Sequence, residues 1–401
     1  MLRAALPMPV RPPRQRERTD AARLGCAPRW VAVATVSLIC GTAMSGRAAG
    51  GSATDAYDGI REGEPVDLHA LLDVYAQRDL AGDPPRYRAF DVSTGLALNF
   101  ARLRVAHAPD PIGLRVDAGI GDTPRAYFRS DPASVSNPGV ARALSYFEQA
   151  FATATMPAGR GVAIDVGKFG TPVGFEDNES PPNWNYSRSL LFALAEPTYH
   201  MGVRATYPAT TTFAFSVFWL NGWNVNVIDG NGMRSFAVAV TAKPEDELEL
   251  VFVYAGGLER APTQLGNPTL SFRNVVDGYV EYDPTDALKL TATADYGIDA
   301  ASGGVRYWGI GGYVQYWPLS SVGGTLRGEY FDDPDGFTTG TPQQIDEGTA
   351  TLEAKTRVGD ASVIGRLEYR RDQSDRAVFP VRDALPTLHQ NTLTLGVTAT
   401  F

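Results

Sequence analysis

Residues that could act as nucleophiles, metal ligands or proton carriers are few and widely spaced in this chain. The four histidines are His69, His107, His200 and His389. They form no HxH or HExxH pair, and no serine lies in a G-x-S-x-G motif. The run over 161–168 departs from a phosphate-binding loop, because its glycine spacing is one residue too long and Phe169 replaces the Ser or Thr. The sequence therefore predicts no catalytic residue, no metal site and no cofactor.

The first 49 residues have the order of features expected of an export signal. Arg23 and Arg29 precede an uncharged, mostly apolar run over 30–44, and small residues follow it. This order is typical of a cleaved signal peptide, and the run is shorter than the roughly 20 residues that a membrane helix needs. We predict that residues 1–49 are removed and that 50–65 form an N-terminal periplasmic segment.

Charge and cysteine content exclude several kinds of partner and site. The chain has a formal net charge of −9, and its first 49 residues hold eight arginines but only two acidic residues. The exported part is therefore more acidic still, which argues against a nucleic-acid partner. Cys26 and Cys40 both lie in the predicted signal peptide. We therefore expect no disulfide, thiolate metal site or cysteine nucleophile in the exported chain.

From about residue 66 onward, apolar and polar residues alternate with a period of two. At the end of the chain, the side chains at every second position from Leu393 to Phe401 are apolar, and those between them are Thr or Gly. This period is the signature of strands with two different faces. About sixteen such segments begin near residues 66, 91, 112, 144, 161, 197, 212, 234, 247, 270, 287, 304, 322, 346, 362 and 388.

The connections between these segments alternate between short turns and longer loops. Short ones such as 108–111 and 283–286 contain Pro, Asp or Thr, whereas 171–196 and 221–233 are long. In lipid every backbone donor and acceptor must be paired, and a closed barrel achieves this without leaving an edge. We therefore predict an all-β fold, a closed antiparallel transmembrane β-barrel of about 16 strands over 66–401, with short periplasmic turns and long extracellular loops. A soluble β-sandwich would leave the alternating loop lengths unexplained.

One segment does not keep the alternation. Within 95–107, Leu96, Leu98 and Phe100 share their parity with Arg102 and Arg104. Either the phase changes at a β-bulge, or the strand is shorter than this range.

The polar faces of the strands supply candidate lumen residues. A pore derives its specificity from its radius and from the charges at its constriction. By parity we predict that these charged side chains face the lumen: Arg115, Asp117, Arg204, Lys289, Asp295, Arg327, Glu329, Glu353, Lys355, Arg357, Arg366 and Glu368. Mixed signs favour hydrated polar solutes over apolar ones, and the net acidity predicts a mild cation preference.

The longest connection, 171–196, is the candidate constriction. Its apolar run over 189–194 is unusual for a solvated loop and would be buried if the loop folded inward against the barrel wall. Acidic loop residues would then face basic wall residues such as Arg204. The candidate constriction residues are Glu176, Asp177, Glu179, Trp184 and Arg188. An external loop packed on a neighbour remains the alternative.

Three runs carry a family resemblance. GKFGTPVGFE over 167–176, N-x-N-Y-S-R-S-L-L-F over 183–192 and FWLNGWNVNVIDGN over 218–231 resemble outer-membrane β-barrel porins of the OmpL-like, porin-2 family. The resemblance spans about 60–401. It implies an outer-membrane porin for passive diffusion of small hydrophilic solutes or ions. The chain is also distantly similar to phosphate-selective porins, but it lacks their many lumen arginines and lysines.

The predicted partners follow from this class of protein. Ending on Phe401 resembles the signal that outer-membrane barrels present to their insertion machinery. We therefore expect the barrel-assembly machinery, outer-membrane lipid and small polar solutes as partners, whereas self-association stays open. The scattered histidines argue against an outer-membrane enzyme. The alternative function is a plugged structural or adhesion barrel whose external loops bind ligands.

Overall fold

The computed structural model describes residues 66–82, 84–226, 234–260, 270–300 and 304–401. The predicted signal peptide and the segment 50–65 lie outside the described residues.

Sixteen strands form one closed barrel, and two further strands form a small separate sheet. The barrel strands are β1 (Asp67–Asp79), β2 (Gly95–His107), β3 (Ile112–Ile120), β4 (Phe147–Met156), β5 (Val162–Gly170), β6 (Tyr199–Tyr207), β7 (Phe213–Leu220), β8 (Ser235–Glu245), β9 (Leu248–Arg260), β10 (Leu270–Thr285), β11 (Leu288–Asp299), β12 (Val305–Leu319), β13 (Val322–Asp333), β14 (Gln343–Val358), β15 (Ala361–Ser374) and β18 (His389–Thr400). The small sheet pairs β16 (Phe379–Val381) with β17 (Ala384–Thr387).

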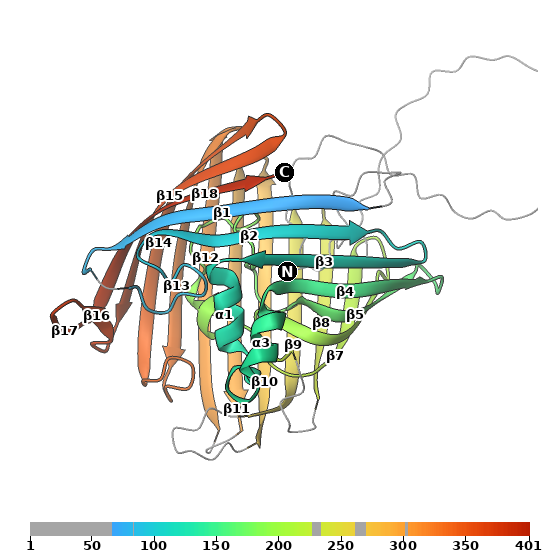
Figure 1. Cartoon of the computed structure of the whole chain (residues 1–401), viewed down its shortest axis with the longest axis horizontal. Helices are drawn as coiled ribbons and strands as arrows, with labels where there is room; N and C mark the ends of the chain where they lie inside the picture. Colours follow the sequence, from blue (N-terminus) through green and yellow to red (C-terminus); the bar gives the residue numbers. More distant parts are fainter. Residues whose placement is uncertain (1–65, 83, 227–233, 261–269, 301–303) are drawn as a thin grey trace, which may run out of the picture.

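Every barrel strand pairs antiparallel with its neighbours, and the first strand pairs with the last. Val74 of β1 lies opposite Val397 of β18, so the ring closes and leaves no strand edge unpaired. Figure 1 shows the first and last strands side by side, with strongly tilted strands around the ring. The predicted all-β, closed antiparallel barrel of about 16 strands is confirmed.

Alternation along each strand separates an inner from an outer face. In β14 the inward Thr351 and Glu353 are buried, whereas the outward Leu352 is 57% exposed on the outer surface. An apolar outer face is what a lipid environment requires of a barrel wall. No helix in the described part of the chain is long and apolar enough to cross a membrane.

The irregular segment 95–107 contains a bulge. Asp73 of β1 lies opposite Phe100 of β2, but the next residue, Val74, lies opposite Leu98, so Asn99 is the extra residue. The first of the two explanations for the broken alternation is therefore correct. The bulge brings Asn99 inward, and its amide donates to Asp73 Oδ2 over 2.6 Å.

Three short helices between β3 and β4 were not expected from the sequence. They are α1 (Asp122–Ser130), α2 (Ala133–Ser136) and α3 (Pro138–Ser145). Figure 1 shows α1 and α3 beside the ends of β3 and β4, the two strands that they connect. The α1 segment is tied to inward residues of the wall, because Tyr75 donates to Asp122 over 2.7 Å and Thr123 to Asn99 over 3.3 Å.

Candidate functional site

The segment between β5 and β6 leaves the wall and crosses the interior of the barrel. Its regular part is the short helix α4 (Leu190–Leu194), which Ser189 caps by accepting the Phe192 amide over 3.0 Å. We call 171–198 the crossing segment. Its apolar run is buried inside the barrel, with Leu190 and Leu191 at most 1% exposed.

Carboxylates of β13 and β15 hold the backbone of the crossing segment. Glu368 accepts the amides of Tyr186 and Ser187 over 2.6 and 3.0 Å. Glu329 accepts those of 190–191 over 2.8 and 3.2 Å. The latter are first-turn amides of α4, which have no partner within the helix. Two carboxylates of the wall thus accept hydrogen bonds that loop carbonyls or a helix-capping side chain usually accept.

Arginines of the same wall hold the carbonyl groups of the segment. Arg366 donates to the carbonyls of Ser180 and Asn183, each over 2.6 Å. Arg327 donates to the Ser187 carbonyl over 2.8 Å and pairs with the Glu176 carboxylate over 2.9 Å. Burial would raise the pKa of Glu176, but Arg327, Arg188 and the hydrogen bonds from Ser189 together outweigh burial, so the pKa is lowered and the carboxylate stays ionised.

The adjoining wall, formed by β1 and β2 and separated from β15 only by β18, holds the segment as well. Asp73 accepts the Ser180 hydroxyl over 2.5 Å and the Tyr186 hydroxyl over 2.9 Å. Arg102 and Arg104 pair with Glu179 over 2.7 and 3.2 Å. The segment is therefore anchored along one continuous arc of the wall, from β13 to β2.

Glycines on the inner face make room for two of its side chains. A side chain at Gly396 of β18 would overlap the ring of Tyr186. A Cβ at Gly309 of β12 would lie 2.5 Å from Leu191. These contacts place a bulky group of the segment directly on the backbone of the wall.

An aromatic cluster joins the segment to β10 and β12. The Phe175 ring lies 5.4 Å from those of Trp184 and Tyr279 and 5.1 Å from that of Tyr313. The rings meet at steep angles, which favours edge-to-face attraction. Trp184, a predicted constriction residue, thus packs within the segment and against β12.

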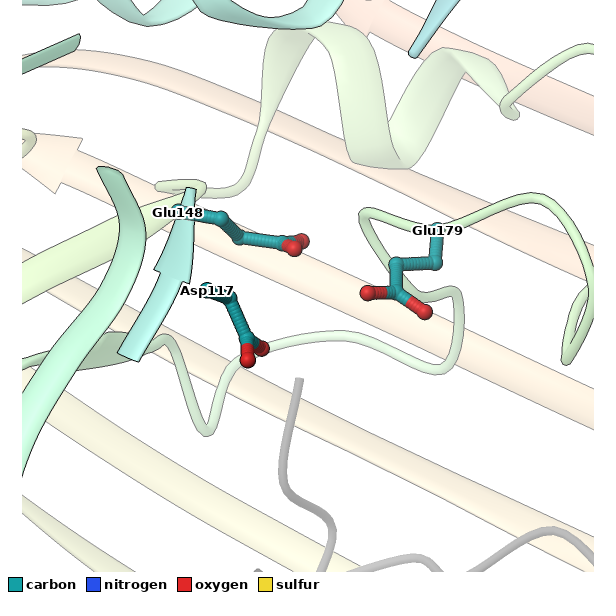
Figure 2. Close-up of side chains that lie close together, drawn as sticks. All are labelled: Asp117, Glu148 and Glu179. Atoms are coloured by element: carbon teal, nitrogen blue, oxygen red, sulfur yellow. The ribbon is translucent and has the colours of Figure 1, made fainter. Parts of the chain in front are cut away.

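Three carboxylates come together between the segment and the wall, as Figure 2 shows for Asp117, Glu148 and Glu179. One oxygen from each lies within 4.8 Å of the others. Arg104 and Arg115 pair with Asp117 over 2.9 and 2.6 Å, so guanidinium groups already neutralise the charge that a cation would need. The arrangement is an ion-pair network.

The predicted lumen residues fall into three groups in the structure. Four contact the crossing segment: Arg327, Glu329, Arg366 and Glu368. Four belong to wall pairs or face a wall neighbour: Arg115, Asp117, Arg204 and Asp295. The remaining four lie near the short turns: Lys289, Glu353, Lys355 and Arg357. Their role toward solutes stays a prediction.

One expectation about an individual contact differs from the structure. Arg204 does not face the acidic residues of the crossing segment, but pairs with Asp165 on the adjacent strand over 2.6 Å. Arg188, a candidate constriction residue, is buried. Its guanidinium donates to the carbonyls of Asp177 and Asn178 and so folds the segment on itself.

Sequence reasoning missed several anchors. Asp73, Asn99, Arg370 and Gly396 all contact the segment, and none was singled out. Parity alone could have found Asp73 and Arg370 on the inner face. An inward glycine inside a strand, as at Gly396, is a usable signal for a closely packed backbone.

The barrel, its apolar outer face and its internal segment define an outer-membrane protein of the porin class. The model of the family described as "Putative beta-barrel porin-2, OmpL-like" matches residues 65–401. The chain belongs to this family and is located in the outer membrane. No curated protein matches the chain.

Solved structures of porins share the fold at low sequence identity. OmpT of Vibrio cholerae in its trimer form is 13% identical, with a TM-score of 0.56 over 84% of this chain and 99% of that one. DcaP of Acinetobacter baumannii is 12% identical, with a TM-score of 0.53 over 84% and 97%. An anion-selective porin from Comamonas acidovorans is 12% identical, with a TM-score of 0.52 over 84% and 99%. Identities this low show the fold alone.

Proposed function

We propose that this protein is a channel for passive diffusion of small hydrophilic solutes or ions, and that the crossing segment sets its narrowest part. The observation that carries the proposal is the segment itself, which enters the lumen and is anchored on β1, β2 and β12–β15. A segment that lies across the lumen in this way reduces the open cross-section of a 16-strand barrel without changing its wall.

We infer that solutes pass on the side of the segment that faces β4–β8. The inner wall there carries the hydroxyl groups of Thr153, Thr206, Ser216 and Thr241 beside the aromatic rings of Phe151, Phe169 and Phe218, and all these side chains are buried. Thr206 and Ser216 share a hydrogen bond of 2.8 Å between their hydroxyls. Hydroxyls and paired charges can replace part of the hydration shell of a polar solute, whereas an apolar solute gains nothing from them.

We also propose how the chain is exported, oriented in the membrane and assembled. Residues 1–49 are the removed signal peptide, 50–65 stay in the periplasm, and the short turns face the periplasm. The last strand presents Phe401 to the assembly machinery. Because OmpT has been solved in a trimer form, we further propose that this barrel associates with copies of itself.

One observation favours the alternative of a plugged structural or adhesion barrel. The helical segment 122–145 is tied to inward residues of β1 and β2, so two connections occupy the barrel rather than one. Tyr127 of α1 packs edge-on against Phe90, and their ring centroids lie 5.8 Å apart. A barrel filled by both segments would hold its shape without conducting.

A conductance measurement decides between the open channel and the plugged barrel. It uses refolded protein that lacks residues 1–49, in a planar bilayer. Heat-modifiable gel mobility first establishes that the barrel has formed. Discrete current steps support the channel, and the reversal potential across a KCl gradient tests the expected cation preference. Folded protein without steps would contradict the channel and favour the plugged barrel.

A further inference from the structure

The outer face of the wall carries a groove over β8–β14, with a volume of about 970 Å³. Two parallel rows of outward residues run along it, and in each row every residue lies opposite the next across a strand pair. The first row is Val240, Phe252, Gly278, Ala294, Ile310, Tyr330 and Asp346, and the second is Ala242, Leu250, Val280, Ala292, Gly312, Gly328 and Gly348. The groove is therefore apolar along most of its length and has a charged residue, Asp346, at one end.

Glycines make the second row deep. A Cβ at Gly312 or Gly348 would meet no atom within 4 Å, and one at Gly328 would reach only a carbonyl oxygen at 4.0 Å. The inward Gly309 and Gly396 differ, because side chains of the crossing segment fill the space beside them. Glycine weakens a strand and often marks a place where a ligand or another backbone approaches closely. No described part of the chain fills the space over the outward glycines, so it is available to another molecule.

The groove lies in the membrane-spanning wall and reaches one membrane interface. Its seven strands, about 4.8 Å apart, give it a length of roughly 29 Å. The strand tilt of about 45° carries it obliquely across a hydrocarbon core about 30 Å thick. At its charged end the Trp308 and Tyr330 rings lie 5.3 Å apart, and such rings are favoured at the level of the lipid headgroups. An acyl chain can therefore lie along the apolar part while its headgroup lies at the charged end.

Two outward charges of opposite sign mark this end of the groove. Asp346 ends the first row, and Arg371 of β15 continues the second row opposite Gly348. The two are diagonal neighbours, which places their side chains roughly 7–8 Å apart. Within the described part of the chain neither forms an ion pair, and the Arg371 guanidinium donates to the neutral Asn391 and Gln373 over 3.2 and 3.1 Å. A headgroup with both a phosphate and an ammonium group complements this pair of charges.

We propose that the groove binds a membrane lipid, with an acyl chain along the two rows and a phosphoethanolamine headgroup between Arg371 and Asp346. The phosphate accepts hydrogen bonds from Arg371, and the ammonium group lies beside Asp346. A lipid with the same chains but an anionic headgroup, such as phosphatidylglycerol, brings no positive charge to Asp346 and binds more weakly. This role is separate from the passage of solutes, because the groove opens on the outside of the wall.

Side chains added to the outward glycines test the acyl-chain site. Gly312→Leu and Gly328→Leu each fill the groove from its floor, and two variants guard against one that does not fold. Gly365→Leu on β15 is the matched control, because Gly365 is outward, its Cβ would meet no atom within 4 Å, and it lies outside the groove. Asp346→Asn tests the headgroup site. Each variant must first show heat-modifiable mobility.

The measurement is native mass spectrometry of the folded exported chain in mild detergent, titrated with phosphatidylethanolamine or with phosphatidylglycerol of the same chains. We expect wild type and Gly365→Leu to saturate with one phosphatidylethanolamine, and both groove variants to need about tenfold more lipid for the same occupancy. Asp346→Asn should lose the preference between the two lipids.

Three results would overturn the inference. Equal occupancy of wild type and both groove variants would remove the acyl-chain site, as would binding of many lipids without saturation. Equal binding of the two lipids to wild type would remove the headgroup site. Protein extracted from membranes that retains a second polypeptide on this face, and no lipid, would assign the groove to a protein partner instead.

Discussion

At the scale of single residues, wall carboxylates act as acceptors for the backbone of another segment. Glu329 and Glu368 each receive two consecutive amides of the crossing segment. A buried amide that loses its acceptor costs about 1–3 kcal/mol. The segment is therefore held as tightly as a structural part of the wall.

Gly396→Val should loosen this attachment. The added side chain displaces the Tyr186 ring and breaks the hydrogen bond of its hydroxyl to Asp73. We expect a larger mean conductance, by about 1.5-fold, and more open-channel noise in single-channel records. Gly365→Val is the matched control, because a Cβ at Gly365 meets no atom within 4 Å. Identical records from the two variants would contradict the role of this glycine.

The pH dependence of the attachment follows from Glu179. Burial would raise its pKa, but Arg102 and Arg104 outweigh burial and lower the pKa from 4.5 to about 2. Since the folded pKa is depressed, the stabilisation is complete above the ordinary value and is lost as pH falls through about 2.

We therefore expect constant conductance from about pH 7 to 4 and a rise below about pH 3, measured on the same channel under perfusion. Glu179→Gln should already show the acid-state conductance at neutral pH. A step change near pH 4.5 in wild type would mean that the two arginines do not hold this carboxylate.

The alternation of inward and outward residues along each strand predicted some of the wall residues that contact the crossing segment. It missed the others for a specific reason. It selected Arg327, Glu329, Arg366 and Glu368, and these four contact the crossing segment. It gave no priority to Asp73 or Gly396, because their importance depends on where Tyr186 lies. That position is set by the path of the crossing segment, which no pattern within a strand encodes.

At the scale of elements, strands were predictable and the helical connection was not. Strand alternation is a local pattern, so β3 at 112 and β13 at 322 begin where the sequence suggests. The segment 122–145 shows no sustained 3.6-residue period, because Pro132 and Pro138 divide it into short helices. Its position depends on tertiary contacts.

Tyr127 is the main apolar contact of that segment. Its ring lies 5.8 Å from Phe90 and 5.5 Å from Tyr199, both edge-on. Tyr127→Ala should release α1 and increase trypsin cleavage after Arg125 and Arg129 by about tenfold, since loss of a large buried aromatic costs about 3–5 kcal/mol.

Phe128→Ala is the control for that measurement, because Phe128 is half-buried and its ring contacts the Arg142 guanidinium at 4.3 Å. Limited proteolysis followed by mass spectrometry gives both rates. Equal cleavage of the two variants would show that α1 is not held by Tyr127.

At the scale of the whole molecule, the last residue helps to close the ring. The Phe401 amide donates to the Ala70 carbonyl over 3.0 Å, and the Ala70 amide donates back over 3.2 Å. The strand end that completes the barrel is thus also the predicted insertion signal. A substitution at Phe401 can separate two effects: closure of the barrel, and recognition of its last strand by the assembly machinery.

Phe401→Ser keeps the backbone pairing and removes the aromatic group. We expect barrel formation in detergent to be unchanged, whereas the amount assembled in the outer membrane of cells falls by about tenfold. Phe401→Tyr keeps the ring and should assemble normally. An equal yield of Phe401→Ser and wild type in membranes, measured by heat-modifiable mobility, would refute the signal.

The account as a whole depends on the crossing segment being the narrowest part of an open channel. The most direct measurement compares single-channel conductance of the exported chain with that of a variant in which 176–195 is replaced by a short Gly-Ser link. Both proteins must first show heat-modifiable mobility. The account predicts discrete steps in both and larger steps in the shortened variant. Equal or smaller steps in the shortened variant would contradict it, because removing a partition from the lumen widens the path.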